Sequence, residues 1–213
     1  MEDITLRAIK VLKEVDLVLA EDTRRTGLLF RHLDIKKPLL SYYEQNELQR
    51  IPEIIDKLKT RQKIALVSNA GTPTLSDPGF KLVRECVKEK IQIVSIPGPS
   101  AILTALTSSG LPTDKFLFLG YLPKKEGKRR KFLLNCKLLS VACTLIFFEA
   151  PHRLIETLAD LKEVFGDMDI IICRELTKIH EEIRREKISQ SLEHFTQTPP
   201  RGEFTLVFNI PQV

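Results

Sequence analysis

Cysteine is scarce and scattered in this sequence. The four cysteines, Cys86, Cys136, Cys143 and Cys173, lie far apart, and no CxxC pair or cysteine–histidine cluster occurs. A structural zinc site needs clustered sulfur and nitrogen ligands, and disulfide frameworks are typical of short, cysteine-dense secreted chains. We therefore expect reduced, buried thiols and no bound metal.

Long apolar runs are also absent. No stretch approaches the roughly 20 apolar residues of a membrane-spanning helix, and the start, Met1-Glu2-Asp3, has neither the basic nor the apolar region of a signal peptide. The sequence contains no repeats of fixed period and no low-complexity tracts. These absences favour a folded, cytoplasmic protein over a membrane, secreted or disordered one.

The chain does contain enough apolar sequence for a core. Hydrophobic residues make up 43% of its 213 residues and charged residues 29%, with a net charge of +5 and a pI near 9.0. This length permits one large or two small domains. The positive charge is a mild indication of a polyanionic partner.

The stretch Lys63 to Gly79 joins a buried strand to a loop of small residues. Residues 64–67 are an apolar run of strand length, and the loop after them has two glycines, two prolines and several hydroxyl or amide side chains. Such residues leave backbone N–H and C=O groups accessible to a ligand. A helical pattern starts at Phe80. This order builds the crevice in which open α/β sheets bind ligands, although a plain connecting loop has the same pattern.

A second junction follows the apolar run 16–20, which predicts a strand. It ends in EDTRR, residues 21–25, which places two carboxylates and two guanidiniums at the carboxyl end of an expected central strand. Acids at this position either stabilise the start of the next helix or take part in chemistry. Both interpretations stay open for Asp22.

Residues 91–96 are a third apolar run, followed by Pro97, Gly98 and Pro99 and an expected helix at 101–109. We expect a strand here, and neighbouring parallel strands bring their loops to one ligand crevice. The turn at 108–112 is the expected domain boundary. It separates an N-terminal α/β domain, 1–111, from a C-terminal α/β domain, 112–213.

The second half repeats the strand-to-polar-loop pattern, with strands expected at 116–121, 141–148, 170–173 and 204–210. A basic segment follows the first of them, with cations at Lys124, Lys125, Lys128, Arg129, Arg130, Lys131 and Lys137. Such a run is either a solvated helix face or a surface that contacts nucleic-acid phosphates. The repeated transitions predict an α/β protein with two lobes.

Seven motifs occur in order along the chain: AEDTRRT, VSNAGTPTLSDPG, SIPGPSA, FLGYLPKK, FFEAPHR, CRELTK and RGEFTLV. Their order resembles the ribosomal RNA small subunit methyltransferase I family of the tetrapyrrole methylase superfamily, over essentially the whole chain. The resemblance implies a two-domain tetrapyrrole methylase fold, with a largely parallel sheet in the N-terminal domain and a mixed sheet in the C-terminal domain. It also implies a homodimer that binds S-adenosyl-L-methionine between its domains and methylates the 2′-hydroxyl of a cytidine in the decoding region of 16S rRNA, in the small ribosomal subunit.

The motifs also assign site residues. The positions that the resemblance implies for the cofactor are Ala70, Gly71, Thr72, Leu75, Ser100, Ala101, Glu149, Ala150 and Leu176. Thr72 stands where corrin and porphyrin relatives usually carry an aspartate. A ribose hydroxyl must lose its proton to become a good nucleophile, so a general base is useful. We expect Asp22 or Glu21 in that role, with Lys178 and Glu149 as competitors. RNA contacts are expected from Arg24, Arg25, Lys124, Lys125, Lys128, Arg129 and Arg130.

The chain departs from the family pattern at its start. Family members open with a strand and a threonine-proline-isoleucine-glycine-asparagine-leucine loop just before the position of Glu2, and that segment is not in this sequence. We expect the first family strand to be missing from the sheet, which leaves an exposed edge. Two other functions stay open: a tetrapyrrole or other small-molecule S-adenosylmethionine methyltransferase, and a non-catalytic RNA-binding or ribosome-assembly protein.

Overall fold

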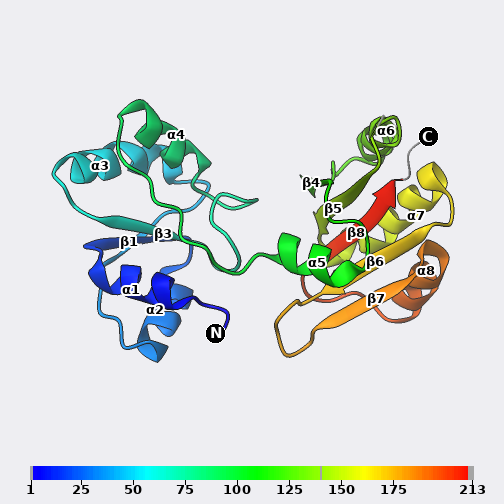
Figure 1. The fold of residues 1–213 in the computed structure, drawn as a ribbon, viewed down its shortest axis with the longest axis horizontal. Helices are drawn as coiled ribbons and strands as arrows, with labels where there is room; N and C mark the ends of the chain where they lie inside the picture. Colours follow the sequence, from blue (N-terminus) through cyan, green and yellow to red (C-terminus); the bar gives the residue numbers. More distant parts are fainter. Residues whose placement is uncertain (1, 140, 211–213) are drawn as a thin grey trace. The chain divides into compact units, whose positions relative to one another are not determined.

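The structure, a computed structural model, describes residues 2–139 and 141–210 and divides the chain after Ser100 into two compact units (Figure 1). The first unit contains α1 (Leu6–Glu14), β1 (Leu17–Ala20), α2 (Thr23–His32), β2 (Leu39–Ser41), α3 (Glu47–Lys59), β3 (Ile64–Val67) and α4 (Phe80–Lys88). The second contains α5 (Ala101–Ser109), β4 (Phe116–Tyr121), α6 (Glu126–Lys137), β5 (Cys143–Glu149), the 3₁₀ helix η1 (Pro151–Arg153), α7 (Leu154–Phe165), β6 (Asp169–Arg174), β7 (Glu182–Lys187), α8 (Ile188–Gln197) and β8 (Phe204–Ile210).

The first unit is built on a parallel sheet of order β2-β1-β3, with helices on both faces (Figure 1). Successive side chains of a strand point to opposite faces, so β1 serves two cores. Val18 packs with α1 and α2, whereas Leu19 packs with α3 and α4. Both side chains are fully buried. The predicted parallel sheet is confirmed, and its central strand is the one that ends in the EDTRR motif.

The strand predicted at 91–96 is wrong. These residues form no regular element, and Ile93 and Val94 are 45% and 67% exposed. A strand exists only where a neighbour completes its ladder. Within the described residues β3 pairs on one edge only, with β1, and no strand pairs with 91–96. The apolar, β-branched sequence is therefore present without the partner that would make it a strand.

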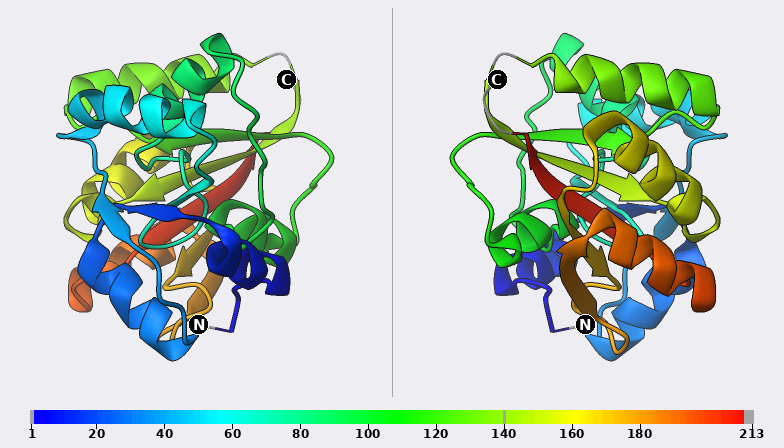
Figure 2. Two further views of the ribbon diagram at one scale, coloured as in Figure 1. Left: turned by 90° about the vertical axis from the view of Figure 1, so that its left-hand side faces the viewer. Right: turned by 90° about the vertical axis from the view of Figure 1, so that its right-hand side faces the viewer.

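The second unit contains a mixed sheet of order β4-β5-β8-β6-β7, as predicted for this half of the chain. Only β4 and β5 pair in parallel; the other neighbours are antiparallel. Helices α6, α7 and α8 cover one face, and α5 covers the other (Figure 2). Because Ala105 and Leu106 of α5 pack on β5 and β8, this helix belongs to the second unit. The division therefore falls after Ser100, earlier than the boundary predicted after residue 111.

Strand β7 was not predicted, because its sequence, EIRREK, lacks the apolar alternation of a half-buried strand. It lies at the edge of the sheet and, among the strands that the structure describes, pairs only with β6. Arg184 forms ion pairs with Glu182 and Glu186 along the strand. Charged side chains on an edge strand discourage pairing with another chain, so the composition suits the position.

No helix in residues 2–139 or 141–210 is long and apolar enough to cross a membrane. The same residues contain no cluster of three or more metal-ligating side chains. All four cysteines are free thiols, and burial raises the pKa of Cys173 to about 11, which keeps this thiol protonated and unreactive.

The open edge of β3 leads to a first prediction. Lengthening the chain upstream by the strand and loop that the family resemblance implies should supply the missing ladder and bury Ile93 and Val94. We expect the longer protein to have a thermal midpoint higher by roughly 5 °C or more, measured by circular dichroism. Equal midpoints and equal association states of the two proteins would contradict it.

Candidate active site

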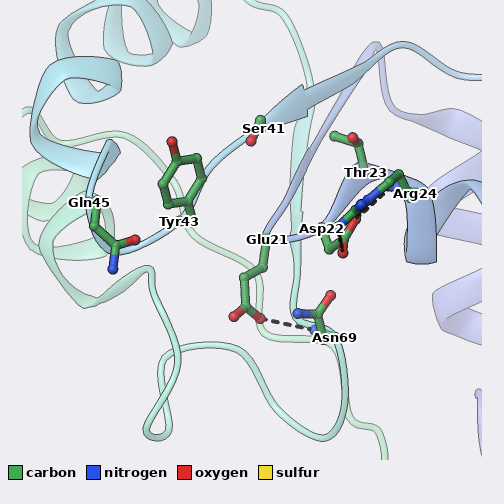
Figure 3. A pocket seen from close by; sticks show the side chains of 8 residues that line it. All are labelled: Glu21, Asp22, Thr23, Arg24, Ser41, Tyr43, Gln45 and Asn69. Atoms are coloured by element: carbon green, nitrogen blue, oxygen red, sulfur yellow. Dashed lines mark hydrogen bonds and ion pairs between the residues drawn. The ribbon is translucent and has the colours of Figure 1, made fainter.

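An open, polar hollow of about 430 Å³ lies at the carboxyl edge of the first sheet (Figure 3). Its lining comes from the ends of all three strands: Glu21 follows β1, Ser41 ends β2 and Asn69 follows β3. Parallel pairing brings these ends together, since the strands share one direction. The complete lining is Glu21, Asp22, Thr23, Arg24, Ser41, Tyr43, Gln45 and Asn69. The EDTRR motif and the loop after β3 therefore meet, as the sequence predicted.

The Asp22 carboxylate forms hydrogen bonds that stabilise the start of α2. It is the N-cap of α2, where its Oδ1 accepts a hydrogen bond from the backbone N–H of Arg24 at 2.9 Å. The Arg24 guanidinium donates to both carboxylate oxygens, at 3.1 and 3.0 Å. These hydrogen bonds lower the pKa of Asp22 to about 2. A carboxylate that binds protons so weakly is a poor general base, so the structure favours the capping interpretation of this residue.

Glu21 is placed differently. Its Oε2 accepts a hydrogen bond from the backbone N–H of Asn69 at 3.4 Å, and the carboxylate forms no ion pair with any described residue. Figure 3 shows its side chain extending between the Tyr43–Gln45 segment and Asn69. Of the two carboxylates in the motif, Glu21 is therefore the one that is free to act on a ligand in the hollow.

The loop after β3 contains two glycines with different surroundings, one beside open space and one packed against a side chain. Gly71 has φ of +67°, and a Cβ added there would meet nothing within 4 Å. Gly79 has φ of +130°, and a Cβ there would lie 2.5 Å from Cδ2 of Leu66. Thr72 Oγ1 donates to the backbone carbonyl of Pro99 at 3.0 Å, so this loop and the 97–100 turn lie together, as predicted. Gly79 serves the fold, whereas Gly71 borders free space.

Glu149 belongs to a buried network. Its carboxylate is almost fully buried and accepts hydrogen bonds from Ala150 N–H at 2.8 Å and Thr157 Oγ1 at 2.6 Å. The Arg153 guanidinium lies 3.3 Å from Oε1 and also donates to the carbonyl of Leu122 at 2.8 Å. The network ties the end of β5 to the loop after β4. It leaves Glu149 without access to a substrate proton, which removes it as a candidate base.

Lys178 lies where the CRELTK and RGEFTLV motifs meet. Its ammonium binds Glu175 at 3.0 Å and Glu203 at 2.9 Å. Burial alone would lower the pKa of Lys178, but the hydrogen bonds to Glu203 and Glu175 outweigh it and raise the pKa. Lys178 therefore stays protonated and cannot act as the base. Leu176, a predicted cofactor position, packs partly buried against the α5 cluster.

Two of the predicted RNA contacts form ion pairs within the second unit. Arg129 is 1% exposed, and its Nε donates to Asp160 of α7 at 2.5 Å. Arg130 donates to Asp160 and Glu163, both at 2.7 Å. Both guanidiniums link α6 to α7, and the buried Arg129 must be paired because a cation in a protein interior is costly when it is not. Arg129 is therefore structural, and Arg130 is engaged with acidic side chains. Three exposed lysines form no ion pair with a described residue: Lys124, Lys125 and Lys128.

Sequence reasoning missed part of the hollow. Tyr43 and Gln45 line it but belong to no recognised motif, and Ser41 and Asn69 were not singled out. The available signal was positional, because all four residues end or follow a strand of the parallel sheet, as the EDTRR motif does. That signal was applied only to the segments with charged or glycine-rich loops.

The basic segment leads to a second prediction. Arg129→Met removes the buried partner of Asp160 and leaves that carboxylate paired only with the partly exposed Arg130. Breaking a buried ion pair is strongly destabilising, so we expect a loss of roughly 3 kcal/mol in the free energy of unfolding. Lys128→Gln, a matched change in the same helix, should alter it by less than about 0.5 kcal/mol. Urea unfolding of both variants provides the measurement. Similar stabilities would show that the Arg129–Asp160 pair does not hold the two helices together.

Comparisons with known proteins agree with the fold and the motifs. The family model for Tetrapyrrole (Corrin/Porphyrin) Methylases matches residues 1–191. A ribosomal RNA small subunit methyltransferase I from Thermotoga maritima is 49% identical over 209 residues, which cover 98% of this chain and 93% of that protein. The protein of the same name from Halalkalibacterium halodurans is 45% identical, over 97% of this chain and 71% of that protein.

Solved structures with low sequence identity share the fold. A cobalt precorrin-4 methyltransferase of cobalamin biosynthesis matches with a TM-score of 0.68 at 16% identity, over 97% of this chain and 89% of that one. A uroporphyrin-III-C-methyltransferase from Thermus thermophilus matches with a TM-score of 0.64 at 19% identity, over 97% and 88%. These structures share the fold, and the family model and the sequence relatives place the chain: it belongs to the tetrapyrrole methylase family and, within it, to the ribosomal RNA small subunit methyltransferase I family.

Proposed function

We propose that this protein uses S-adenosyl-L-methionine to methylate the 2′-hydroxyl of a cytidine in the RNA of the small ribosomal subunit. One observation carries the proposal: 49% identity, over nearly the whole chain, to a protein named ribosomal RNA small subunit methyltransferase I. The polar hollow supports it, because it presents a carboxylate and exposed amide and phenol groups at the edge where α/β sheets bind ligands. A homodimer, which the resemblance implies, is part of the proposal.

The loop after β3 fits the cofactor. Ala70 and Leu75 are exposed, and the open space beside Gly71 lets a ligand approach the backbone closely. When bound, S-adenosyl-L-methionine supplies an electrophilic methyl group on its sulfonium. Ala70, Gly71, Thr72 and Leu75 would hold it through backbone groups and small side chains. For Ser100, Ala101, Glu149, Ala150 and Leu176 a role in binding the cofactor rests on the resemblance.

Glu21 is the proposed general base. Three observations support this choice over the other candidates: Asp22 has a pKa of about 2, Glu149 is enclosed and Lys178 holds its proton. Its carboxylate would take the proton of the 2′-hydroxyl, while the backbone N–H of Asn69 holds Oε2 in place. Most of the acceleration in such a displacement comes from holding the reacting atoms close and in line. By taking the hydroxyl proton, the base prevents a positive charge from building up on the attacking oxygen.

Exposed cations are the proposed contacts to RNA phosphates. Arg25 is exposed and forms no ion pair with a described residue, and Lys124, Lys125 and Lys128 are equally available. Arg24 is highly exposed as well, and its guanidinium, which uses Nε and Nη2 on Asp22, has further N–H groups to offer a phosphate. Contacts to phosphates increase the affinity for RNA of any sequence, and this contribution decreases as the salt concentration rises.

The test of the function is methyl transfer from tritiated S-adenosyl-L-methionine to isolated small ribosomal subunits. We expect incorporation into the RNA, at a nucleotide that becomes resistant to alkaline cleavage, because cleavage needs a free 2′-hydroxyl. Glu21→Gln should lower the rate by roughly 10²–10⁴-fold, as removal of a general base does. Asp22→Asn, which keeps an N-capping side chain, should retain far more activity.

Two results would contradict these assignments. Incorporation into porphyrin precursors and none into subunit RNA would reject the RNA substrate. Full activity of Glu21→Gln, with Asp22→Asn inactive but folded, would reverse the roles of the two carboxylates.

The cofactor loop is tested by binding alone. Gly71→Leu fills the space beside the backbone, so we expect calorimetry to show no measurable binding of S-adenosyl-L-methionine. Circular dichroism should show a folded protein, because a Cβ at this position meets nothing within 4 Å and the strain of a φ of +67° is confined to an exposed loop. Gly79→Ala is the contrasting variant, since its Cβ would collide with Leu66 and should lower stability. Unchanged cofactor affinity in Gly71→Leu would remove this loop from the site.

A further inference from the structure

The segment after β2 forms a tight turn that projects two side chains at the hollow. Tyr43 N–H donates to Oδ1 of Asn46 at 2.8 Å, and Asn46 Nδ2 donates to the carbonyl of Ser41 at 3.1 Å. The Tyr43 carbonyl accepts hydrogen bonds from the N–H groups of Asn46 and Glu47, at 3.0 and 2.9 Å. The backbone and Asn46 hold this turn by themselves. The side chains of Tyr43 and Gln45 are not needed for it.

Two adjacent tyrosines have opposite environments. Tyr42 is fully buried, and its hydroxyl donates to Oε2 of Glu47 at 3.2 Å. Burial and the nearby Glu47 carboxylate raise the pKa of Tyr42, so it stays a neutral core residue. Tyr43 is 38% exposed, lines the hollow and makes no side-chain hydrogen bond to a described residue. The Tyr42 side chain is therefore part of the core, whereas the hydrogen-bonded turn holds the Tyr43 side chain at the surface.

The chemistry of the lining suits a nucleoside. Tyr43 offers an exposed aromatic face, on which an unstacked base can lie. Gln45 has an exposed amide, which both donates and accepts hydrogen bonds and can pair with the edge of a base. Glu21 offers a carboxylate that accepts a hydrogen bond from a ribose hydroxyl. The volume, about 430 Å³, lies within the range of roughly 300–1,000 Å³ that is usual for ligand pockets.

We infer that the hollow is the subsite for one nucleoside of the substrate RNA, turned out of its stack, with its base on Tyr43 and hydrogen-bonded by Gln45 and its 2′-hydroxyl at Glu21. The inference rests on the proposed function and adds the residues that hold the target nucleotide. Proteins that recognise RNA by sequence mostly bind unstacked nucleotides, whose bases stack on aromatic side chains and form hydrogen bonds along their edges. Arg25 lies just along the chain from Glu21 and is available for a flanking phosphate.

A nucleoside also occurs in the cofactor, so the experiment separates the two sources. Binding of a fluorescein-labelled oligocytidylate is measured by anisotropy, binding of S-adenosyl-L-methionine by calorimetry, and methyl transfer on small subunits by tritium incorporation. The variants are Tyr43→Ala, Tyr43→Phe and Gln45→Ala. Gln49→Ala is the matched control, because Gln49 is exposed one turn further along but does not line the hollow.

Tyr43→Ala should weaken oligocytidylate binding by roughly five- to hundredfold, which is the usual effect of losing a stacked base. It should raise the KM for small subunits and leave the affinity for S-adenosyl-L-methionine unchanged. Gln45→Ala should act in the same direction. Tyr43→Phe keeps the ring and should bind within about twofold of the unchanged protein, as should Gln49→Ala.

Three results would overturn the inference. The first is unchanged oligocytidylate binding by Tyr43→Ala. The second is no measurable binding by the unchanged protein. The third is a loss of cofactor affinity in Tyr43→Ala, which would assign the hollow to the adenosine of S-adenosyl-L-methionine. A protein that binds oligocytidylate through Tyr43 but methylates no subunit RNA would reject the proposed function and still support the subsite.

Discussion

Parallel pairing on both edges of β1 is the constraint on which the first unit depends. The strand is short, and Val18, Leu19 and Ala20 are completely buried, so its register against β2 and β3 cannot shift without exposing a core residue. The same register brings the three carboxyl ends to one edge. Glu21 and Asn69 then come within hydrogen-bonding distance although 48 residues separate them. The position of the site therefore follows from the packing of the sheet.

Some charged residues of the motifs form ion pairs within the protein, and others are exposed without one. Only the structure distinguishes the two groups. Arg129 and Lys128 are neighbours in one basic run, yet Arg129 is buried against Asp160 and Lys128 is exposed. The pairing is long-range, over 31 residues, so local composition carries no information about it. A buried cation left unpaired would cost several kcal/mol. Such residues are therefore essential to stability and unavailable to a ligand, however basic the surrounding sequence is.

The sequence predicted well what depends on local pattern: two α/β lobes, a parallel and a mixed sheet, and polar loops at the strand ends. The prediction failed where pairing with a neighbouring strand determines whether a segment becomes a strand. Residues 91–96 have strand composition but no ladder partner, and β7 has a ladder partner but no strand composition. In the site, the motifs led to Glu21 and to the loop around Gly71. They did not lead to Tyr43, because an aromatic next to an apolar run is usually a core residue, as Tyr42 is.

The contrast between adjacent residues at the strand ends has a common physical origin. Alternation of side chains continues for a residue or two beyond the last ladder hydrogen bond, so one neighbour enters the core or caps a helix and the next faces the hollow. Tyr42 lies in the core, and Asp22, which also borders the hollow, is occupied as the cap of α2. Glu21 and Tyr43 have the second role. An insertion of one residue in either segment would exchange these roles, burying the group that meets the ligand and exposing the one that holds the fold. Spacing from the strand end, as much as residue type, therefore determines which side chains can do chemistry here.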